Sequence, residues 1–294
     1  MAMSRDFADA VRRIGRDSEM DSIRAAIALV APLHGKPPYA GVKIERDIPY
    51  GAHERHRLDL FRPVDRRDEP RPVLLFVHGG GFIGGDKAMP GSPFYDNIGV
   101  WAARHGMIGV NITYRLAPEH RWPAGAVDLS SAVEWVKAEI RQHGGDPGRV
   151  FVAGTSAGAV HVASYLAGPY GAASKVAGAI LLSCLFDMPT CEKNPLLMAY
   201  FGDDESRYPA QSTLKAVAET PVPVLVTVAE YDPIDFERQT LMYVNAYFDA
   251  HGELPNLIRL MGHNHFTTGW HIGLGQDEYL GERMLDFMTH AGPR

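Results

Sequence analysis

The stretch Val-Phe-Val-Ala-Gly-Thr-Ser-Ala-Gly, residues 150–158, indicates the fold of this chain. Four apolar residues precede Gly154, a serine follows two positions later, and small residues begin the next segment. This order predicts a buried strand, a sharp turn and a helix, with the hydroxyl of Ser156 at the turn. Glycine at 154 and 158 avoids clashes at such a strained turn, and the helix N-terminus places N–H groups where negative charge develops during acyl transfer.

The composition is that of an ordinary globular protein, and the length is sufficient for one large α/β domain. The chain has 294 residues, of which 46% are hydrophobic and 22% are charged. Its formal net charge is −6 and it has no basic run, so it carries no electrostatic signature of a nucleic-acid-binding protein. Two cysteines, Cys184 and Cys191, are too few for a disulfide scaffold, although one local bridge stays open.

Neither the N-terminal segment nor the longest apolar stretch suggests a secreted or membrane protein. Residues 1–16 carry charges throughout and lack the apolar core of a secretory signal. The longest apolar stretch, residues 176–186, is too short for a membrane span and contains Gly178 and Ser183. We therefore expect a cytoplasmic protein without a membrane span.

Strands alternate with helices over most of the chain. Apolar spacing predicts helices in two pieces over residues 5–31, and two short strands follow at 42–48 and 56–61. Further apolar strands are expected at 73–78, 107–114, 150–154, 177–182, 222–229 and 257–260. Between them we expect helices at 129–140, after 157, around Leu241, Val244 and Phe248, and at 278–288. This alternation predicts an α/β fold with one mostly parallel sheet and helices on both faces.

One interval breaks the alternation. Residues 186–221 contain a short amphipathic piece and an acidic turn between two predicted strands. An insertion at the carboxyl edge of an open α/β sheet is well placed to act as a cap over a ligand site. An ordinary long surface connection is the alternative.

The partners of an activated serine follow Ser156 in the chain order serine, acid, histidine. Asp232 stands just past the strand at 222–229, and His265 follows the last strand. We therefore expect Asp232 to be the orienting acid and His265 the base. The competitors are two acids and two further histidines: Asp235, which we expect to cap a helix, and Glu230, His263 and His271.

The donors for a developing oxyanion are predicted by His78-Gly79-Gly80-Gly81-Phe82, directly after the strand at 73–78. Consecutive glycines let backbone N–H groups approach an oxyanion without interference from a Cβ atom. We expect Gly80 and Gly81 to donate, together with Ala157. A phosphate-binding loop is disfavoured because no Gly-Lys-Ser/Thr follows the glycines.

These motifs occur together with residues 114–120 (Tyr-Arg-Leu-Ala-Pro-Glu-His), 122–124 (Trp-Pro-Ala), 145–147 (Gly-Asp-Pro), 232–233 (Asp-Pro) and 265–266 (His-Phe). From about residue 48 to its end, the chain resembles the hormone-sensitive-lipase-like (type IV) bacterial carboxylesterases. These belong to the alpha/beta-hydrolase superfamily, and Gly-Thr-Ser-Ala-Gly is typical of one subgroup of them.

The resemblance implies a catalytic domain at 41–294 and a small, mainly helical cap formed by residues 1–40 and the insertion at 186–221. It implies a triad of Ser156, Asp232 and His265 and an oxyanion hole of Gly80, Gly81 and Ala157. His78, Arg115 and Glu119 would support the oxyanion loop. Hydrolysis of short-chain or small acyl esters without cofactor or metal is the implied activity, and a homodimer is the implied assembly.

Two alternatives stay open. The family commonly has His-Gly-Phe at the base, whereas this chain has His-Asn-His-Phe at 263–266, which is closer to arylformamidase-like hydrolases. An arylformamidase or amide hydrolase would use the same three residues. A ligand-binding protein on this fold is less favoured, because all three residue types of the triad are present.

Overall fold

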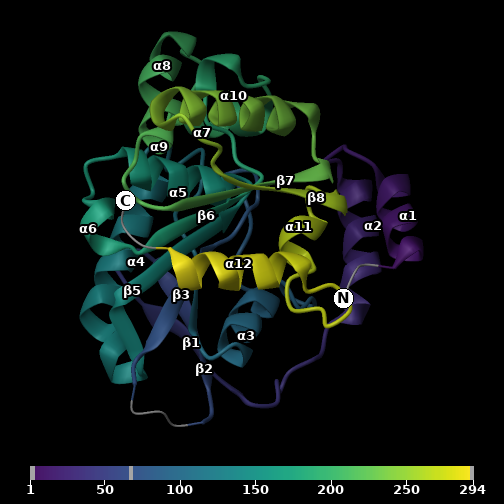
Figure 1. The fold of residues 1–294 in the computed structure, drawn as a ribbon, viewed down its shortest axis with the longest axis vertical. Coiled ribbons are helices and arrows are strands. Elements are labelled where there is room, and N and C mark those ends of the chain that lie inside the picture. Colours follow the sequence, from purple (N-terminus) through teal and green to yellow (C-terminus); the bar gives the residue numbers. More distant parts are fainter. Residues whose placement is uncertain (1–3, 66–68, 292–294) are drawn as a thin grey trace.

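The computed structural model describes residues 4–65 and 69–291, and one eight-stranded sheet lies at its centre (Figure 1). The order of strands is β1-β2-β4-β3-β5-β6-β7-β8. The sheet consists of β1 (Val42–Pro49), β2 (Arg57–Pro63), β3 (Arg71–Val77), β4 (Ile108–Ile112), β5 (Gly145–Thr155), β6 (Gly178–Leu182), β7 (Val224–Tyr231) and β8 (Asn256–Asn264). Strands β3 to β8 are parallel, and β2 is antiparallel to both β1 and β4. The mostly parallel sheet predicted from the sequence is therefore confirmed.

Helices cover both faces of the sheet, as predicted. One face packs against α4 (Ala124–Glu139), α5 (Ala157–Ala167) and α10 (Ile234–His251), and the other against α3 (Asp96–Arg104) and α12 (Tyr279–His290). Shorter helical pieces are η2 (Ile140–His143), α6 (Ala172–Lys175) and α11 (Thr267–Trp270). No helix among the described residues combines the length and the apolar character that crossing a bilayer requires.

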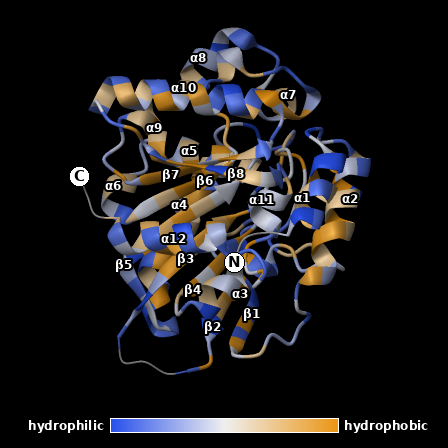
Figure 2. Ribbon diagram, turned by 45° about the vertical axis from the view of Figure 1, so that its right-hand side comes forward, coloured by the Kyte–Doolittle hydropathy of each residue, from blue (hydrophilic) through white to orange (hydrophobic). Residues whose placement is uncertain are grey.

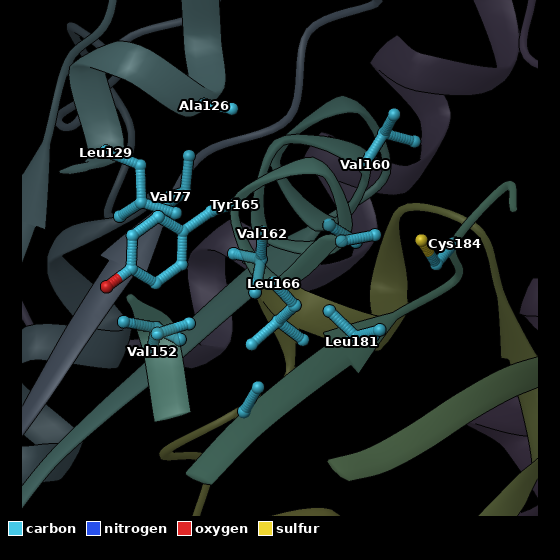
Figure 3. Close-up of a cluster of buried hydrophobic side chains, with 14 of the residues drawn as sticks. Val77, Ala126, Leu129, Val152, Val160, Val162, Tyr165, Leu166, Leu181 and Cys184 are labelled. Carbon is cyan, nitrogen blue, oxygen red and sulfur yellow. The ribbon is translucent and has the colours of Figure 1, made fainter. Parts of the chain in front are cut away.

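The core is divided between these two faces because side chains alternate along each strand. Val77 of β3 and Val152 of β5 pack with α4 and α5, whereas their neighbours Phe76 and Phe151 pack on the opposite face. Figure 3 shows Val77 and Val152 in a cluster with side chains of α4 and α5, among them Leu129, Val160, Val162 and Tyr165. Both faces of β3 and β5 are buried, which explains why these segments are continuously apolar in sequence.

The N-terminal helices α1 (Arg5–Ile14) and α2 (Met20–Val30), followed by η1 (Ala31–Leu33), lie beside β8 and α11 (Figures 1 and 2). Arg12 Nε donates to the hydroxyl of Tyr231 at 3.0 Å, and Arg16 forms an ion pair with Glu237 at 3.1 Å. These contacts bring α1 to the carboxyl ends of β7 and β8, where ligand sites lie in α/β folds.

The insertion at 186–221 forms η3 (Met188–Thr190), α7 (Pro195–Phe201), η4 (Glu205–Arg207), α8 (Tyr208–Gln211) and α9 (Leu214–Ala218). Figure 2 shows α7, α8 and α10 together at one end of the molecule. The side chain of Gln239 on α10 accepts hydrogen bonds from the backbone of Phe186 and Asp187, at 3.0 and 2.7 Å. Both cysteines, Cys184 and Cys191, are buried free thiols, so the local bridge left open by the sequence does not form.

Candidate active site

Ser156 occupies the sharp turn between β5 and α5 that the sequence predicts. Its backbone has φ 54° and ψ −122°, a conformation that is unfavourable for a residue with a side chain. A hydrogen bond from the Ser156 N–H to the carbonyl oxygen of Leu182, at 2.9 Å, holds this strained residue. A Cβ atom on Gly154 would collide with the carbonyl of Gly158, and one on Gly158 with that of Val77. Both glycines are therefore required by the close approach of neighbouring elements.

The side chains of Ser156, His265 and Asp232 form a continuous hydrogen-bonded relay. His265 Nε2 lies 2.8 Å from Ser156 Oγ, and His265 Nδ1 lies 2.7 Å from Asp232 Oδ1. Because an ionised carboxylate only accepts hydrogen bonds, Nδ1 carries the proton and Nε2 faces the serine as an acceptor. Asp232 is fully buried and His265 is 8% exposed, whereas Ser156 is partly exposed. The arrangement can remove a proton from the serine hydroxyl.

Three groups that the sequence analysis did not identify hold Asp232. The Ser183 hydroxyl donates to Asp232 Oδ2 at 2.7 Å, and the backbone N–H of Ala229 donates to the same oxygen at 2.6 Å. Arg16 of α1 donates to the Asp232 backbone carbonyl at 2.7 Å. Ser183 directly follows the apolar strand β6. A polar residue at the carboxyl end of a buried parallel strand is the signal that could have indicated it.

The competing acids point elsewhere. Asp235 Oδ2 accepts from the backbone N–H of Glu192, at 2.9 Å, and so ties the insertion to α10. Its expected role as the cap of α10 is wrong, since α10 begins after Pro233 without a side-chain cap. Glu230 accepts from the backbone N–H of Gly262 at 2.7 Å.

The competing histidines form a separate group. His263 Nε2 lies 2.9 Å from Asp277 Oδ2, and the rings of His263 and His271 have their centroids 4.0 Å apart. Burial lowers the pKa of His271 to about 3. Of the three histidines considered for the base, the structure brings His265 alone within hydrogen-bond distance of Ser156.

The glycine run after β3 forms a tight loop beside the serine. Gly80 and Gly81 have φ angles of 135° and 59°, which side-chain-bearing residues rarely adopt, and Gly84 N donates to the carbonyl of Gly80 at 3.1 Å. A Cβ atom on Gly79 would lie 3.3 Å from Ser156 Cβ. Ala157 opens α5, so its N–H has no intrahelical partner. The glycine loop thus approaches the nucleophile at Gly79, and Ala157 directly follows Ser156 at the start of α5.

His78 supports this loop from within the core. Its Nδ1 lies 2.6 Å from the carbonyl oxygen of Gly79, and its ring stacks on Tyr114 with centroids 4.3 Å apart. The Tyr114 hydroxyl donates to the carbonyl of His78 at 3.0 Å. Burial lowers the pKa of His78 to about 3, so the ring is neutral and its Nδ1–H donates to Gly79.

The other two predicted supporting residues do not touch the glycine loop. Arg115 forms an ion pair with the buried Asp128 at 2.7 Å, and its backbone N–H donates to the same carboxylate. Glu119 is exposed and makes no hydrogen bond or ion pair with the residues that the structure describes. Arg55 contacts the loop region instead, donating to the carbonyl oxygens of Tyr114 at 2.7 Å and Gly85 at 3.0 Å. Arg115 and Glu119 therefore make no hydrogen bond to the glycine loop among the described residues, and the role expected of them is not seen there.

Comparison with known proteins agrees with this architecture. A family model described as the alpha/beta hydrolase fold matches residues 74–267, which is more than half of the chain. The chain belongs to the alpha/beta-hydrolase fold family. The matched residues include the glycine loop, the serine turn and the positions of both Asp232 and His265.

Relatives of this hydrolase-fold chain are esterases. It is 29% identical to esterase LipQ of Mycobacterium tuberculosis over 71% of its own length and 55% of that protein. It is 37% identical to esterase LipC of the same organism over 38% of its own length and 27% of LipC. The chain thus matches between about a quarter and half of the length of these curated relatives. The family match and these relatives confirm the resemblance to hormone-sensitive-lipase-like esterases.

Solved structures share the fold over nearly the whole chain. A bacterial heroin esterase aligns with a TM-score of 0.72 and 22% identity, covering 99% of this chain and 98% of that protein. At this level of identity the likeness shows the common fold. The predicted alpha/beta-hydrolase architecture is therefore confirmed.

Proposed function

We propose that this chain is a serine carboxylesterase that hydrolyses short-chain or small acyl esters through an acyl-enzyme intermediate. The observation that carries this proposal is the relay in which His265 lies 2.8 Å from Ser156 and 2.7 Å from Asp232. This geometry is the one that activates a serine hydroxyl for attack on a carbonyl carbon. The esterase relatives support an ester as the substrate class.

The proposed mechanism follows from the directions of these hydrogen bonds. His265 Nε2 takes the proton as Ser156 Oγ bonds to the ester carbonyl carbon, and buried Asp232 stabilises the imidazolium that forms. The N–H groups of Gly80, Gly81 and Ala157 would hold the oxyanion. His265 then returns the proton to the leaving alcohol, and a water molecule, activated by the same histidine, hydrolyses the acyl enzyme. The three side chains and three backbone donors suffice for this sequence without a cofactor.

We assign the cap to residues 1–40 and the insertion at 186–221, and the catalytic domain to 41–294; residues 1–3, 66–68 and 292–294 of these ranges lie outside the part of the chain that the structure describes. The insertion reaches the oxyanion loop, because a Cβ atom on Gly81 would lie 2.8 Å from Leu196 Cδ1 of α7. The ring of Phe236 packs against the ring of His265, with their centroids 4.5 Å apart. The preference for short-chain or small acyl groups is proposed from the resemblance to type IV carboxylesterases. A homodimer and a cytoplasmic location remain proposals that rest on the sequence analysis.

The alternatives receive no separate support. The arylformamidase hypothesis rests on the motif His-Asn-His-Phe, and its extra histidine, His263, bonds to Asp277 and not to Ser156. A ligand-binding protein without catalysis would not need the serine, histidine and aspartate aligned within hydrogen-bond distance. Carboxylic ester hydrolysis is the function that this geometry favours.

The decisive experiment compares hydrolysis of p-nitrophenyl acetate, butyrate and octanoate by the wild type, Ser156→Ala and Ser164→Ala. Ser164 is a buried serine on α5 whose hydroxyl has no hydrogen-bond partner among the described residues, so its variant is the matched control. We expect turnover that is highest for the short esters, is lost in Ser156→Ala and is retained in Ser164→Ala. Phosphonylation of Ser156 by a p-nitrophenyl alkylphosphonate, read by mass spectrometry, tests the nucleophile independently. An inactive, unlabelled wild type or an equally active Ser156→Ala variant would overturn the proposal.

A further inference from the structure

A second group of titratable side chains lies close to the segment that carries His265. His263, at the end of β8, meets His271 and Asp277 from the segment between α11 and α12. One ligand atom from each lies within 4.8 Å of the other two. Their side chains are 3%, 1% and 9% exposed. The proposed esterase mechanism uses none of them.

His271 has a lone pair without a partner. Its Nδ1 lies 2.7 Å from the carbonyl oxygen of Thr267. A carbonyl oxygen only accepts, so Nδ1 carries the ring proton and Nε2 is left with its lone pair. Nε2 has no hydrogen-bond partner among the described residues, and it lies 3.9 Å from Asp277 Oδ2. Burying such an atom without a partner is costly, so the site favours a cation there.

His263 can present a second lone pair to the same point. Its Nε2 lies 2.9 Å from Asp277 Oδ2, and its Nδ1 lies 3.2 Å from Thr267 Oγ1. The Thr267 hydroxyl can accept from His263 Nδ1–H and from the Asn264 N–H while it donates to the Asn264 carbonyl oxygen. In that arrangement two imidazole nitrogens and a carboxylate oxygen converge. A proton shared between His263 Nε2 and Asp277 Oδ2 would leave His271 Nε2 without a partner. A metal ion would bind all three of these atoms.

We propose that His263 Nε2, His271 Nε2 and Asp277 Oδ2 bind a divalent transition-metal ion of the zinc type. Imidazole nitrogen and carboxylate oxygen are ordinary zinc ligands, and ligand atoms in a tetrahedral zinc site lie about 3.3 Å apart. The two separations from Asp277, 2.9 and 3.9 Å, bracket that value. Both rings are oriented through Nδ1, by a carbonyl and by a hydroxyl, as ligating histidines usually are. A water molecule would complete the tetrahedron.

The ion would hold together three segments of the chain. It joins the end of β8, the residue after α11 and the segment that leads into α12. His263 stands two residues before His265, and the ring of Phe7 from α1 lies against it with centroids 6.0 Å apart. The ion therefore has a structural role, stabilising the turn on which the proposed catalytic base stands and the docking of α1.

The test measures metal content and stability, so it does not depend on esterase activity. Wild type, His271→Ala, Asp277→Asn and the control His290→Ala are produced with Zn²⁺ in the medium and passed over a chelating resin. His290 is an exposed histidine on α12, 76% exposed. We expect about one zinc per chain in the wild type and the control, and at least about tenfold weaker retention in the two ligand variants. Chelator should lower the Tm of the wild type and Zn²⁺ should restore it, with no such response in His271→Ala.

A titration of the chelator-treated wild type with Co²⁺ covers the case in which the ligand variants fail to fold. Tetrahedral Co²⁺ bound by these ligands absorbs visible light, and Zn²⁺ should displace it. The proposal is overturned if the wild type retains no more metal than background and shows no Co²⁺ absorption. It is equally overturned if His271→Ala folds and retains as much zinc as His290→Ala, since the metal would then lie elsewhere.

Discussion

Ser183 illustrates how one residue outside the relay controls the geometry within it. Its hydroxyl occupies Asp232 Oδ2 while His265 occupies Oδ1, so the carboxylate is held from both sides. Asp232 is fully buried, and a buried carboxylate needs such partners to remain ionised and oriented. Ser183 therefore influences Ser156 indirectly, through Asp232 and His265.

Replacing Ser183 with alanine should lower kcat by about tenfold for a short ester. Hydrogen bonds to charged groups contribute about 1.5–3 kcal/mol, and part of this loss is compensated by the Ala229 N–H, which still binds Oδ2. KM should change little, because Ser183 positions Asp232 and does not contact the substrate. The measurement is steady-state hydrolysis of p-nitrophenyl butyrate, with Ser164→Ala as the control. Equal kcat values in the two variants would show that Ala229 alone holds the carboxylate.

At the scale of an element, the glycine loop after β3 depends on its backbone conformation. Gly80 has a φ of 135°, and a Cβ atom added to it would collide with the backbone of Gly84 and Gly85. A Cβ atom on Gly84, in the same loop, would have its nearest contact at 3.7 Å, an ordinary van der Waals separation. The two glycines therefore differ in what a methyl group would disturb, although both belong to one turn.

Gly80→Ala should lower kcat by about 100-fold or more, because the loop must shift and the predicted oxyanion donors move with it. Gly84→Ala should retain activity within a few-fold of the wild type. The measurement is kcat with p-nitrophenyl butyrate, accompanied by thermal unfolding of both variants. If Gly84→Ala loses as much activity as Gly80→Ala, the loop is sensitive to any added side chain and the assignment of a specific donor geometry fails.

The strands of the sheet were predictable from the sequence, whereas helix α3, which is buried on every side, was not. The strands β3 and β5 stand out as apolar runs, and the order of Ser156, Asp232 and His265 follows from the ends of three strands. Helix α3 escaped prediction because its residues 96–103 are all buried, which leaves no amphipathic period. On α10 the expected apolar residues Leu241 and Phe248 are 65% and 50% exposed, while Tyr243 and Tyr247 face the core.

The candidate active site also contains residues that the sequence predicts and residues that it does not. Glycines, the serine turn and the histidine after the last strand carry local signals, and the structure brings them together. Arg16 reaches Asp232 across 216 positions of sequence, and Arg55 donates to the carbonyl oxygens of Tyr114 and Gly85, a contact that no motif predicted. Such contacts depend on how α1 and the segment before β2 pack against the sheet. No local pattern in the sequence encodes that packing.

At the scale of the whole molecule, the core beneath the oxyanion loop contains two buried histidines. His78 stacks on Tyr114, and His161 of α5 packs against the rings of Phe82, Tyr114 and Tyr200. Burial lowers the pKa of both histidines to about 3, from an ordinary value of 6.5. The folded protein therefore holds both rings neutral at pH values where the unfolded chain protonates them.

This difference should make the protein lose stability as the pH falls. Because the pKa of His161 is lower in the folded state, its effect is absent above about pH 6.5 and grows as the pH falls from there toward 3. The free energy of unfolding should decrease by about 1.4 kcal/mol per pH unit for each such histidine, or by about 2 kcal/mol between pH 6.5 and 5. In His161→Leu this share of the loss should disappear, even if the variant is less stable at pH 7. Urea unfolding of the wild type, His161→Leu and the exposed-site control His290→Leu at pH 7 and 5 measures it. If the loss between these two pH values is the same in His161→Leu as in the wild type, His161 is not the buried neutral group that the structure indicates.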